Sequence, residues 1–249
     1  MQPLDVLITS TCRKTIEPTL KGFLAKVSCP RGFRFVVNID VLDPGYLERE
    51  LAFLKGMGIT EIMVNREVVS PGVNHARAVT RLFNSVRSPF FFFLEDDWLF
   101  LRRVDLDPLV NLMERYPFID HIRFSKEKIK KRAWLYYVSQ EISEDVLRDN
   151  TQADLDGIPL VKSWGWTFNP GLNRSALLKD FGGNGIVEAS AEVWVSRRYQ
   201  EVYKNRGVYI YGRIGEPAAV KDLGRDRLLQ WLRKAKHIIS GKKYAEYKF

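Results

Sequence analysis

The first half of the chain alternates between short apolar runs and stretches in which apolar residues recur every three to four positions. The apolar runs predict four strands, at residues 4–9, 33–39, 59–65 and 90–94. The periodic stretches predict helices over residues 17–27, 46–57 and 73–86. This order, β-α-β-α-β-α-β, predicts an α/β fold with a doubly wound, mostly parallel sheet and right-handed crossovers.

The most apolar run, Phe90–Leu94, is followed directly by Glu95, Asp96 and Asp97. Five apolar residues in a row are typical of a strand buried on both faces. Ligands of open α/β sheets bind beyond the carboxyl ends of the strands. Adjacent carboxylates repel one another unless a cation lies between them. We therefore interpret the triplet as a divalent-cation site rather than as a solvated acidic turn.

The loop after the first strand, Thr9–Arg13, contains no glycine. It is therefore neither a dinucleotide fingerprint nor a P-loop, which argues against a dehydrogenase or an ATPase. We expect a nucleotide to be held by the hydroxyls of Thr9 and Thr11 and by Arg13, with Asp40 at the tip of the second strand. Arg77, one turn into the third helix, would reach a pyrophosphate. Each residue alone has a surface cap or an ion pair as its alternative role.

The second half predicts a helix over 106–116 and strands over 119–124 and 208–211. The basic run 126–132 is interpreted as a solvated face rather than as an electrostatic funnel. Residues 139–159 are polar and acidic, which predicts a surface excursion near a cleft. Trp164, Gly165 and Trp166 either pack in the core or stack on sugar rings, and the pattern leaves both roles open.

Composition narrows the class of partner. With 249 residues, 45% of them hydrophobic, the chain can bury one substantial core, and its net charge of +9 favours anionic partners. It has only Cys12 and Cys29, no apolar run of the roughly 18–20 residues that span a bilayer, and no signal-peptide pattern. We therefore expect a cytoplasmic protein in a reducing compartment.

The chain is expected to form one domain over 1–224, with a nucleotide-binding half at 1–104 and a second half at 105–224. Residues 225–249 are basic and carry an apolar stripe at helical spacing. They predict a C-terminal amphipathic helix. The helix either docks on the domain or contacts an anionic membrane surface peripherally.

The order and spacing of these segments resemble the nucleotide-sugar glycosyltransferases of the GT-A fold, especially the family-2-like enzymes. Residues 8–13 resemble their Pro-Thr-Tyr-Asn-Arg-like loop, and Asp40 matches the Asp that contacts the base. The segment Gly72-Val73-Asn74-His75-Ala76-Arg77 matches their Gly-x-x-x-Ala-Arg pattern. Glu95-Asp96-Asp97 corresponds to the Asp-x-Asp metal motif, and residues 105–224 to the acceptor half.

This resemblance implies that Asp97 ligates Mn²⁺ or Mg²⁺ bridging the donor diphosphate, while Glu95 and Asp96 hold the metal shell or the ribose. Asn74, like Arg77, belongs by this match to the donor-binding set. Many relatives place a metal-binding His in a His-x-Gly-like context after the late strand. This chain has Val220-Lys221-Asp222-Leu223-Gly224 there, so either Lys221 contacts phosphate or Asp222 serves the metal.

The catalytic base is also implied by the resemblance. The family carries a Glu-Asp-x-Asp-Leu-like motif at the start of a helix, and Glu192 takes the place of its basic Asp. The neighbouring acid is Ala191 here, so Glu188 is the alternative base. The alternative role for Glu192 is structural, as a first-turn acid that complements the helix dipole.

The sequence therefore predicts a metal-dependent, inverting glycosyltransferase that moves a sugar from a nucleoside-diphosphate sugar to a hydroxyl of a glycan, lipid-linked or protein-linked acceptor. A nucleotidyltransferase is one alternative, although it would need a glycine-rich basic loop after the first strand. The other is a non-catalytic basic protein that binds nucleic acid or a polyanionic glycan. For the glycosyltransferase, no nucleic-acid partner is expected.

Overall fold

The computed structural model describes residues 2–67, 69–138, 143–182, 186, 191–204 and 206–224. The helices are α1 (Ile16–Lys26), α2 (Pro44–Gly56), α3 (Pro71–Asn84), α4 (Asp107–Arg115), α5 (Leu178–Gly182), α6 (Ala191–Tyr203) and the 3₁₀ turn η1 (Ser175–Leu177). The strands are β1 (Leu4–Ser10), β2 (Val27–Ser28), β3 (Phe33–Asp40), β4 (Glu61–Asn65), β5 (Phe90–Glu95), β6 (Trp98–Phe100), β7 (Val104–Asp105), β8 (His121–Arg123), β9 (Arg132–Val138), β10 (Ser143–Asp149), β11 (Thr151–Leu155), β12 (Ile158–Lys162), β13 (Gly171–Arg174), β14 (Val208–Tyr211) and β15 (Val220–Asp222). The helix predicted at 225–249 lies outside the described residues.

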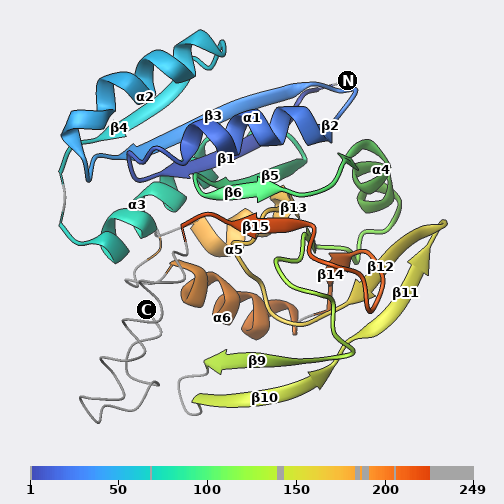
Figure 1. Cartoon of the computed structure of the whole chain (residues 1–249). Coiled ribbons are helices and arrows are strands. Elements are labelled where there is room, and N and C mark those ends of the chain that lie inside the picture. The colour runs from blue at the N-terminus through green and yellow to red at the C-terminus, as the bar shows by residue number, and fades with distance from the viewer. Residues whose placement is uncertain are drawn as a thin grey trace.

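Nine strands form one sheet in the order β11-β12-β14-β8-β13-β5-β1-β3-β4 (Figure 1). Strands β5, β1, β3 and β4 are parallel neighbours, as the pattern of the first half predicts. Antiparallel pairing begins at β13, which runs against both β5 and β8. The predicted α/β fold is confirmed, and the second half extends the same sheet as a mixed one.

Strand β5 lies between two helical layers because alternate side chains of a strand point to opposite faces. Phe92 and Leu94 belong to the apolar cluster that also contains side chains of α1, α2 and α4. Phe91 and Phe93 belong to the cluster formed with α3, α5 and α6. The run without polar residues is therefore what a strand covered on both faces requires, and each buried Phe contributes about 2–3 kcal/mol.

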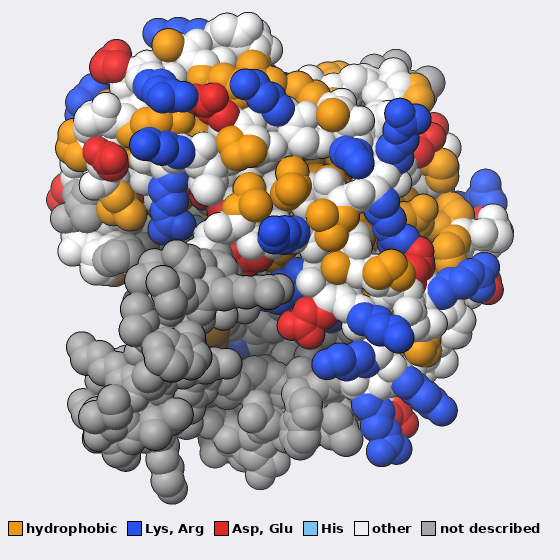
Figure 2. Space-filling model, in the orientation of Figure 1, with side chains coloured by type: hydrophobic (Ala, Val, Ile, Leu, Met, Phe, Trp, Pro, Cys, Tyr) orange, Lys and Arg blue, Asp and Glu red, His pale blue; other side chains and the backbone are white. Residues whose placement is uncertain are grey.

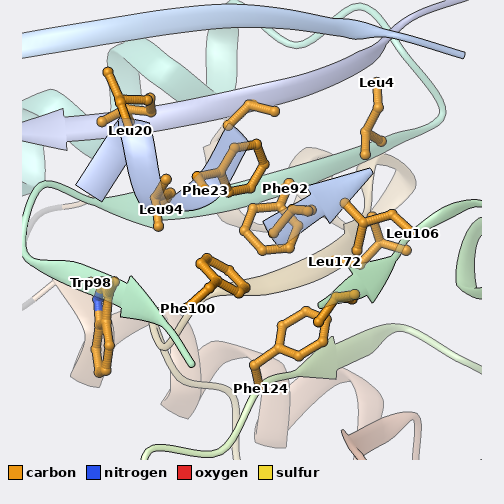
Figure 3. Packing of buried hydrophobic residues seen from close by; sticks show 14 of the residues in the cluster. Leu4, Leu20, Phe23, Phe92, Leu94, Trp98, Phe100, Leu106, Phe124 and Leu172 are labelled. Carbon is orange, nitrogen blue, oxygen red and sulfur yellow. The ribbon is translucent and has the colours of Figure 1, made fainter. Parts of the chain in front are cut away.

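Aromatic rings join the two halves of the chain on the first of these faces (Figure 3). The ring of Phe92 lies 5.5 Å from that of Phe23 on α1 and 5.9 Å from that of Phe124, just after β8. Phe100 on β6 completes the group at 6.2 Å from Phe92. Residues far apart in the sequence thus share one core, and the halves do not pack as separate units.

Residues 151–162 overlap the segment 139–159 that is predicted as a surface excursion, and they have regular structure. They form the antiparallel pair β11 and β12 at the edge of the main sheet. In β11, Thr151, Gln152 and Asp154 are exposed, which gives an edge strand its polar composition. Main-chain hydrogen bonds to β12 therefore hold this edge strand in the sheet, and such bonds leave no apolar pattern in the sequence. The neighbouring strands β9 and β10 pair separately as a two-stranded sheet.

The short strands β6 and β15 pair in antiparallel fashion beyond the end of β5, with Asp222 opposite Trp98. The Leu223 N–H donates to the carbonyl of Asp97 at 2.6 Å. This pairing brings Asp97 and Asp222 together, although 124 residues separate them in the chain. The β6–β15 pairing thus fixes the backbone on both sides of Asp97.

The surface seen in Figure 2 carries many Lys and Arg side chains, interspersed with apolar ones. They are spread over this face and do not form one compact patch. None of the helices in the described part of the chain is both long enough and apolar enough to cross a membrane.

Candidate functional site

Asp96 anchors the loop between β1 and α1 to the end of β5. Its Oδ2 accepts the Ser10 hydroxyl and the Thr11 N–H, both at 2.9 Å. The Thr19 hydroxyl donates to the Asp96 carbonyl, and the Asp96 N–H donates to the Thr9 carbonyl. Burial raises the pKa of Asp96, although these donors oppose the rise. The structure therefore gives this predicted donor-binding residue a loop-holding role.

Asp97 is the acid of the triplet whose carboxylate lies near Asp222 and Arg13. Burial raises its pKa to about 7, and Glu95, Asp96 and Asp222 add repulsion, while Arg13 opposes the rise from 4.0 Å. Gly224 lies against it, because a Cβ there would be 2.1 Å from Oδ2 of Asp97. Repelling hard oxygens in a partly enclosed place are the chemistry that a divalent cation compensates.

Glu95 points towards a different group of side chains. Its Oε2 accepts the indole N–H of Trp98 at 3.3 Å, and its Oε1 lies 3.4 Å from Nε2 of His75 on α3. Burial would lower the pKa of His75, but the nearby Glu95 carboxylate outweighs it, and the net pKa is raised. Glu95 thus joins the metal-side acids to His75.

Glu192 lies in the first turn of α6, where its Oε1 accepts the N–H of Phe168 at 3.0 Å. Its side chain reaches solvent, yet protein groups surround the carboxylate. Burial raises its pKa and the charge of Glu95 adds to the rise, whereas the Phe168 N–H, Lys126 and His75 favour the charged form. Glu192 is therefore electrostatically connected to Glu95 and His75, as a base at the same site would be.

Asp40 is the last residue of β3, and it is hydrogen-bonded to Asn65, which the sequence pattern did not indicate as a site residue. Its Oδ1 accepts the side-chain N–H groups of Asn38 at 3.3 Å and of Asn65 at 3.2 Å. Burial raises the pKa of Asp40, and both amides oppose the rise. Asn65 ends β4 in the same way that Asp40 ends β3, and this matching position in the sequence was the signal that could have identified it.

Lys126 is a second residue that pattern reasoning missed, since the basic run containing it predicts a solvated face. Its Nζ lies 5.9 Å from the centre of the Trp98 ring, and its charge acts on Glu192. A cation over an aromatic face is attracted to the ring electrons, which favours this position of the ammonium group. The run therefore contributes one residue to the site.

Several predicted residues lie at the margin of this group. The amide of Asn74 is used locally: its Oδ1 accepts the Val69 N–H at 3.0 Å and its Nδ2 donates to the Glu67 carbonyl at 2.8 Å. Arg77 lies on the surface, 3.6 Å from Glu67. Thr9 is buried within β1, and Lys221 is exposed on β15. Thr11 and Arg13 flank the acidic triplet, as described above.

The two tryptophans have different roles. Trp166 is 2% exposed and stacks on His121 at 4.5 Å, so the core-packing alternative is correct for it. Trp164 is partly exposed, and its indole N–H donates to the Asp149 carbonyl at 3.3 Å. Gly165 between them has a φ of 71°, a left-handed conformation that glycine adopts without strain. Only Trp164 of the pair has a surface to offer a ligand.

Residues of the described part do not bring three His, Cys, Asp or Glu side chains into a ready-made metal site. Asp97 and Asp222 fit Mn²⁺ or Mg²⁺ in kind, because both metals take carboxylate oxygens and accept further ligands from phosphate and water. Glu188, the alternative base, lies outside the described residues.

The fold is similar to that of solved GT-A nucleotide-sugar glycosyltransferases, which confirms the predicted fold. One such structure is GalNAc-T7 with UDP, GalNAc and Mn²⁺, with a TM-score of 0.60 and 12% identity over 88% of this chain and 43% of that one. Staphylococcus aureus TarS 1–349 in complex with UDP gives a TM-score of 0.54 and 14% identity, over 88% and 60%.

The mannosyltransferase PcManGT from Pyrobaculum calidifontis, in complex with GDP-Man and Mn²⁺, gives a TM-score of 0.53 and 14% identity. The match covers 96% of this chain and 63% of that one. This chain thus spans less than two thirds of each of these three structures. No protein-family model and no curated protein matches the sequence.

Proposed function

We propose that the chain is a metal-dependent, inverting glycosyltransferase that moves a sugar from a nucleoside-diphosphate sugar to an acceptor hydroxyl. The observation that carries this proposal is the arrangement of Asp97 and Glu192 around Glu95 and His75, at the carboxyl end of β5 in a GT-A fold. The structural neighbours, whose complexes contain UDP, GDP-Man and Mn²⁺, support a donor of this chemistry.

The donor would lie over the ends of β1 and β3. There Asp40 accepts amide hydrogen bonds through Oδ1, and a base or ribose would donate to its other oxygen. Thr11 and Arg13, at the start of the loop that Asp96 anchors, would meet the phosphates. Helix α3 contributes His75 rather than Asn74, because the amide of Asn74 is used within its own loop.

Asp97 would hold Mn²⁺ or Mg²⁺ together with Asp222, which replaces the missing family histidine. When bound, such an ion stabilises the negative charge that develops on the departing diphosphate. Gly224 leaves room for the Asp97 carboxylate, and Arg13 provides a protein cation on the same side.

Glu192 would be the general base. The acceptor oxygen forms a bond to the anomeric carbon, the bond from that carbon to the diphosphate oxygen breaks, and the hydroxyl proton passes to Glu192. Attack from the face opposite the leaving group inverts the anomeric configuration. A carboxylate whose pKa is raised is a stronger base than an exposed one, and the Phe168 N–H fixes its orientation.

Calorimetric titration of UDP, GDP, dTDP and CDP, with and without Mn²⁺, tests the donor site. We expect one nucleotide to bind in a Mn²⁺-dependent manner, and Asp97→Ala to lose this dependence because it removes the principal ligand. Glu67→Ala, an exposed carboxylate outside the acidic group, is the control and should leave binding unchanged. Absence of binding by every nucleotide, with and without metal, would contradict the proposed function.

A further inference from the structure

Arg123 is a positive side chain that is half-buried in the second half of the sheet. It lies on β8, between β13 and β14. Its Nη2 donates to the Ser163 hydroxyl at 2.9 Å, its Nη1 reaches the Thr167 hydroxyl at 3.5 Å, and its buried Nε has no partner among the described residues. Both contacts are neutral, and no described carboxylate forms an ion pair with it. The charge of Arg123 is therefore not locally neutralised.

The electrostatics agree with this geometry. Burial lowers the pKa of Arg123 to about 10, so the guanidinium remains charged at neutral pH. The charge of Glu192 opposes this shift, although no ion pair joins Arg123 to a carboxylate among the described residues. A charge withdrawn from water without a partner is costly, and a bound anion would remove that cost.

The two hydroxyls extend the set of donors. Ser163 and Thr167 accept hydrogen bonds from Arg123, and neither hydroxyl donates to another described residue. Each therefore keeps an O–H group available to a ligand. A guanidinium with unused N–H groups beside two O–H donors is suited to a phosphate or carboxylate, whose oxygens accept several charge-assisted hydrogen bonds.

The position of Arg123 indicates the acceptor rather than the donor. Thr167 immediately precedes Phe168, whose N–H binds Glu192. In the sheet, β13 and β5 separate β8 from β1 and β3, which carry Arg13 and Asp40 near their ends. The donor diphosphate would therefore lie on the far side of β5, and the anion at Arg123 would belong to the molecule that Glu192 activates.

We propose that Arg123, with Ser163 and Thr167, binds an oxyanion carried by the acceptor, a phosphate monoester or a carboxylate. This rests on the proposed function, because the base at Glu192 defines the acceptor side. The acceptor class is then an anionic sugar or glycan, in agreement with the basic net charge of the chain. An arginine with a purely structural role would stabilise the fold without distinguishing charged from neutral acceptors.

Glucose, glucuronate and glucose 6-phosphate test the proposal, because they differ only in the group at C6. Each is titrated into the full chain by NMR, with Mn²⁺ and the nucleotide that binds best held at saturation so that the donor site is filled. We expect at least one anionic sugar to bind about tenfold or more tightly than glucose. Whether phosphate or carboxylate is preferred identifies the oxyanion. Equal binding of all three, or no detectable binding of any, overturns the proposal.

Three variants locate the effect. Arg123→Gln should lose the preference for the anionic sugar, whereas Arg103→Gln, which removes the same charge from an exposed residue near β7, should keep it. Thr167→Val keeps the side-chain shape and should lower the preference several-fold, so the proposal stays testable if Arg123→Gln fails to fold. An unchanged preference in Arg123→Gln, or in Thr167→Val if the former does not fold, overturns it. Failure of the proposed glycosyltransferase function is distinguishable from failure of the Arg123 proposal, because it appears as absence of nucleotide binding in a separate titration. In that case the sugars are titrated without nucleotide.

Discussion

Glu192 has one carboxylate oxygen committed to the protein and one available to substrate. Oε1 accepts the Phe168 N–H at 3.0 Å, and no other described residue donates to this side chain. His75 and Lys126 lie near enough for their charges to act on it. A single residue can thus combine a fixed orientation with the proton-accepting role that inverting transfer requires.

Glu192→Gln should lower kcat for sugar transfer by roughly 10²- to 10⁴-fold, because the amide cannot accept the hydroxyl proton. Nucleotide affinity should stay as in the parent protein, since the proposed donor site lies around Asp97 and Asp40. Steady-state kinetics and calorimetry measure the two effects separately. Glu201→Gln, in an exposed position of the same helix, is the control. Full activity in Glu192→Gln would assign the base elsewhere.

Glu50 on α2 is a fully buried carboxylate outside this reaction. Neither of its side-chain oxygens has a hydrogen-bond partner among the described residues, although Ser10 and Cys12 lie near enough to favour its charged form. Burial raises its pKa to about 7, and the charge of Asp96 adds to the rise. A group whose pKa is raised on folding stabilises the protein below its unfolded pKa, and this contribution is lost as pH rises through the folded pKa.

Glu50→Gln should therefore be more stable than the parent protein above pH 8, by on the order of 3 kcal/mol. The difference should shrink as pH falls towards 5, where Glu50 in the folded protein is protonated. Urea unfolding at both pH values measures the change. The exposed Glu48 on the same helix gives the matched variant, Glu48→Gln, which should show no such pH dependence. A difference that does not vary with pH would show that Glu50 does not titrate in this range.

At the scale of elements, the pairing of β6 with β15 shapes the metal-side half of the site. It places Gly224 against the Asp97 carboxylate and Asp222 beside it. A pair of strands only three residues long is weak in isolation, so this pair depends on the surrounding core that buries Trp98, Phe100 and Val220. The geometry of the acids is therefore set by a contact between the middle of the chain and its last described residues.

Gly224→Ala tests this arrangement, because the added methyl group would require the Asp97 carboxylate to move. We expect Mn²⁺-dependent nucleotide affinity to fall about tenfold, while the free energy of unfolding changes by less than about 1 kcal/mol. Gly56→Ala, where a Cβ meets no atom within 4 Å, is the control. Unchanged affinity in Gly224→Ala would show that Asp97 can adjust without loss of metal binding.

At the scale of the whole molecule, a single core extends through both halves of the chain. Strand β5 stands at its centre, and Phe92 contacts rings from α1, β6 and the segment after β8. The acidic triplet follows this strand directly. The packed core around β5 therefore fixes the backbone position from which the three carboxylates extend. The division into halves at 104 and 105 thus describes sequence order rather than separate packing units.

Phe92→Ala should lower the free energy of unfolding by about 3–5 kcal/mol, since it leaves a cavity at the meeting point of the two halves. Urea denaturation followed by fluorescence and by circular dichroism should give one coincident transition. Phe118→Ala, whose side chain is 43% exposed, should change stability far less. Two separate transitions in the parent protein would contradict a shared core.

Peripheral contact of 225–249 with an anionic membrane remains a prediction from sequence. The described residues carry many cations on the face shown in Figure 2, so anionic surfaces are attracted by the domain as well. The tail itself lies outside the described residues, and the prediction that it contacts a membrane rests on its apolar stripe and its basic charge.

The sequence by itself determined the first four strands, the helices between them and the placement of the acidic triplet at the end of β5. Hydrophobic periodicity is local, and strands in parallel α/β units are long and apolar enough to show it. The same local signals led to Asp40, which directly follows a predicted strand, and to Arg13, which lies in the loop after one. Glu192 came from its place at the start of a predicted helix and from the family resemblance.

Only the tertiary structure decided which of these side chains face one another. Asp96 and Asn74 bind loops of the protein, Trp166 enters the core, and Arg123 becomes a half-buried cation through its neighbours on other strands. These roles depend on contacts across the sheet between residues distant in the chain. Residue type and spacing do not encode such contacts, since the same polar side chain can serve a loop, a core or a ligand until its partners are placed.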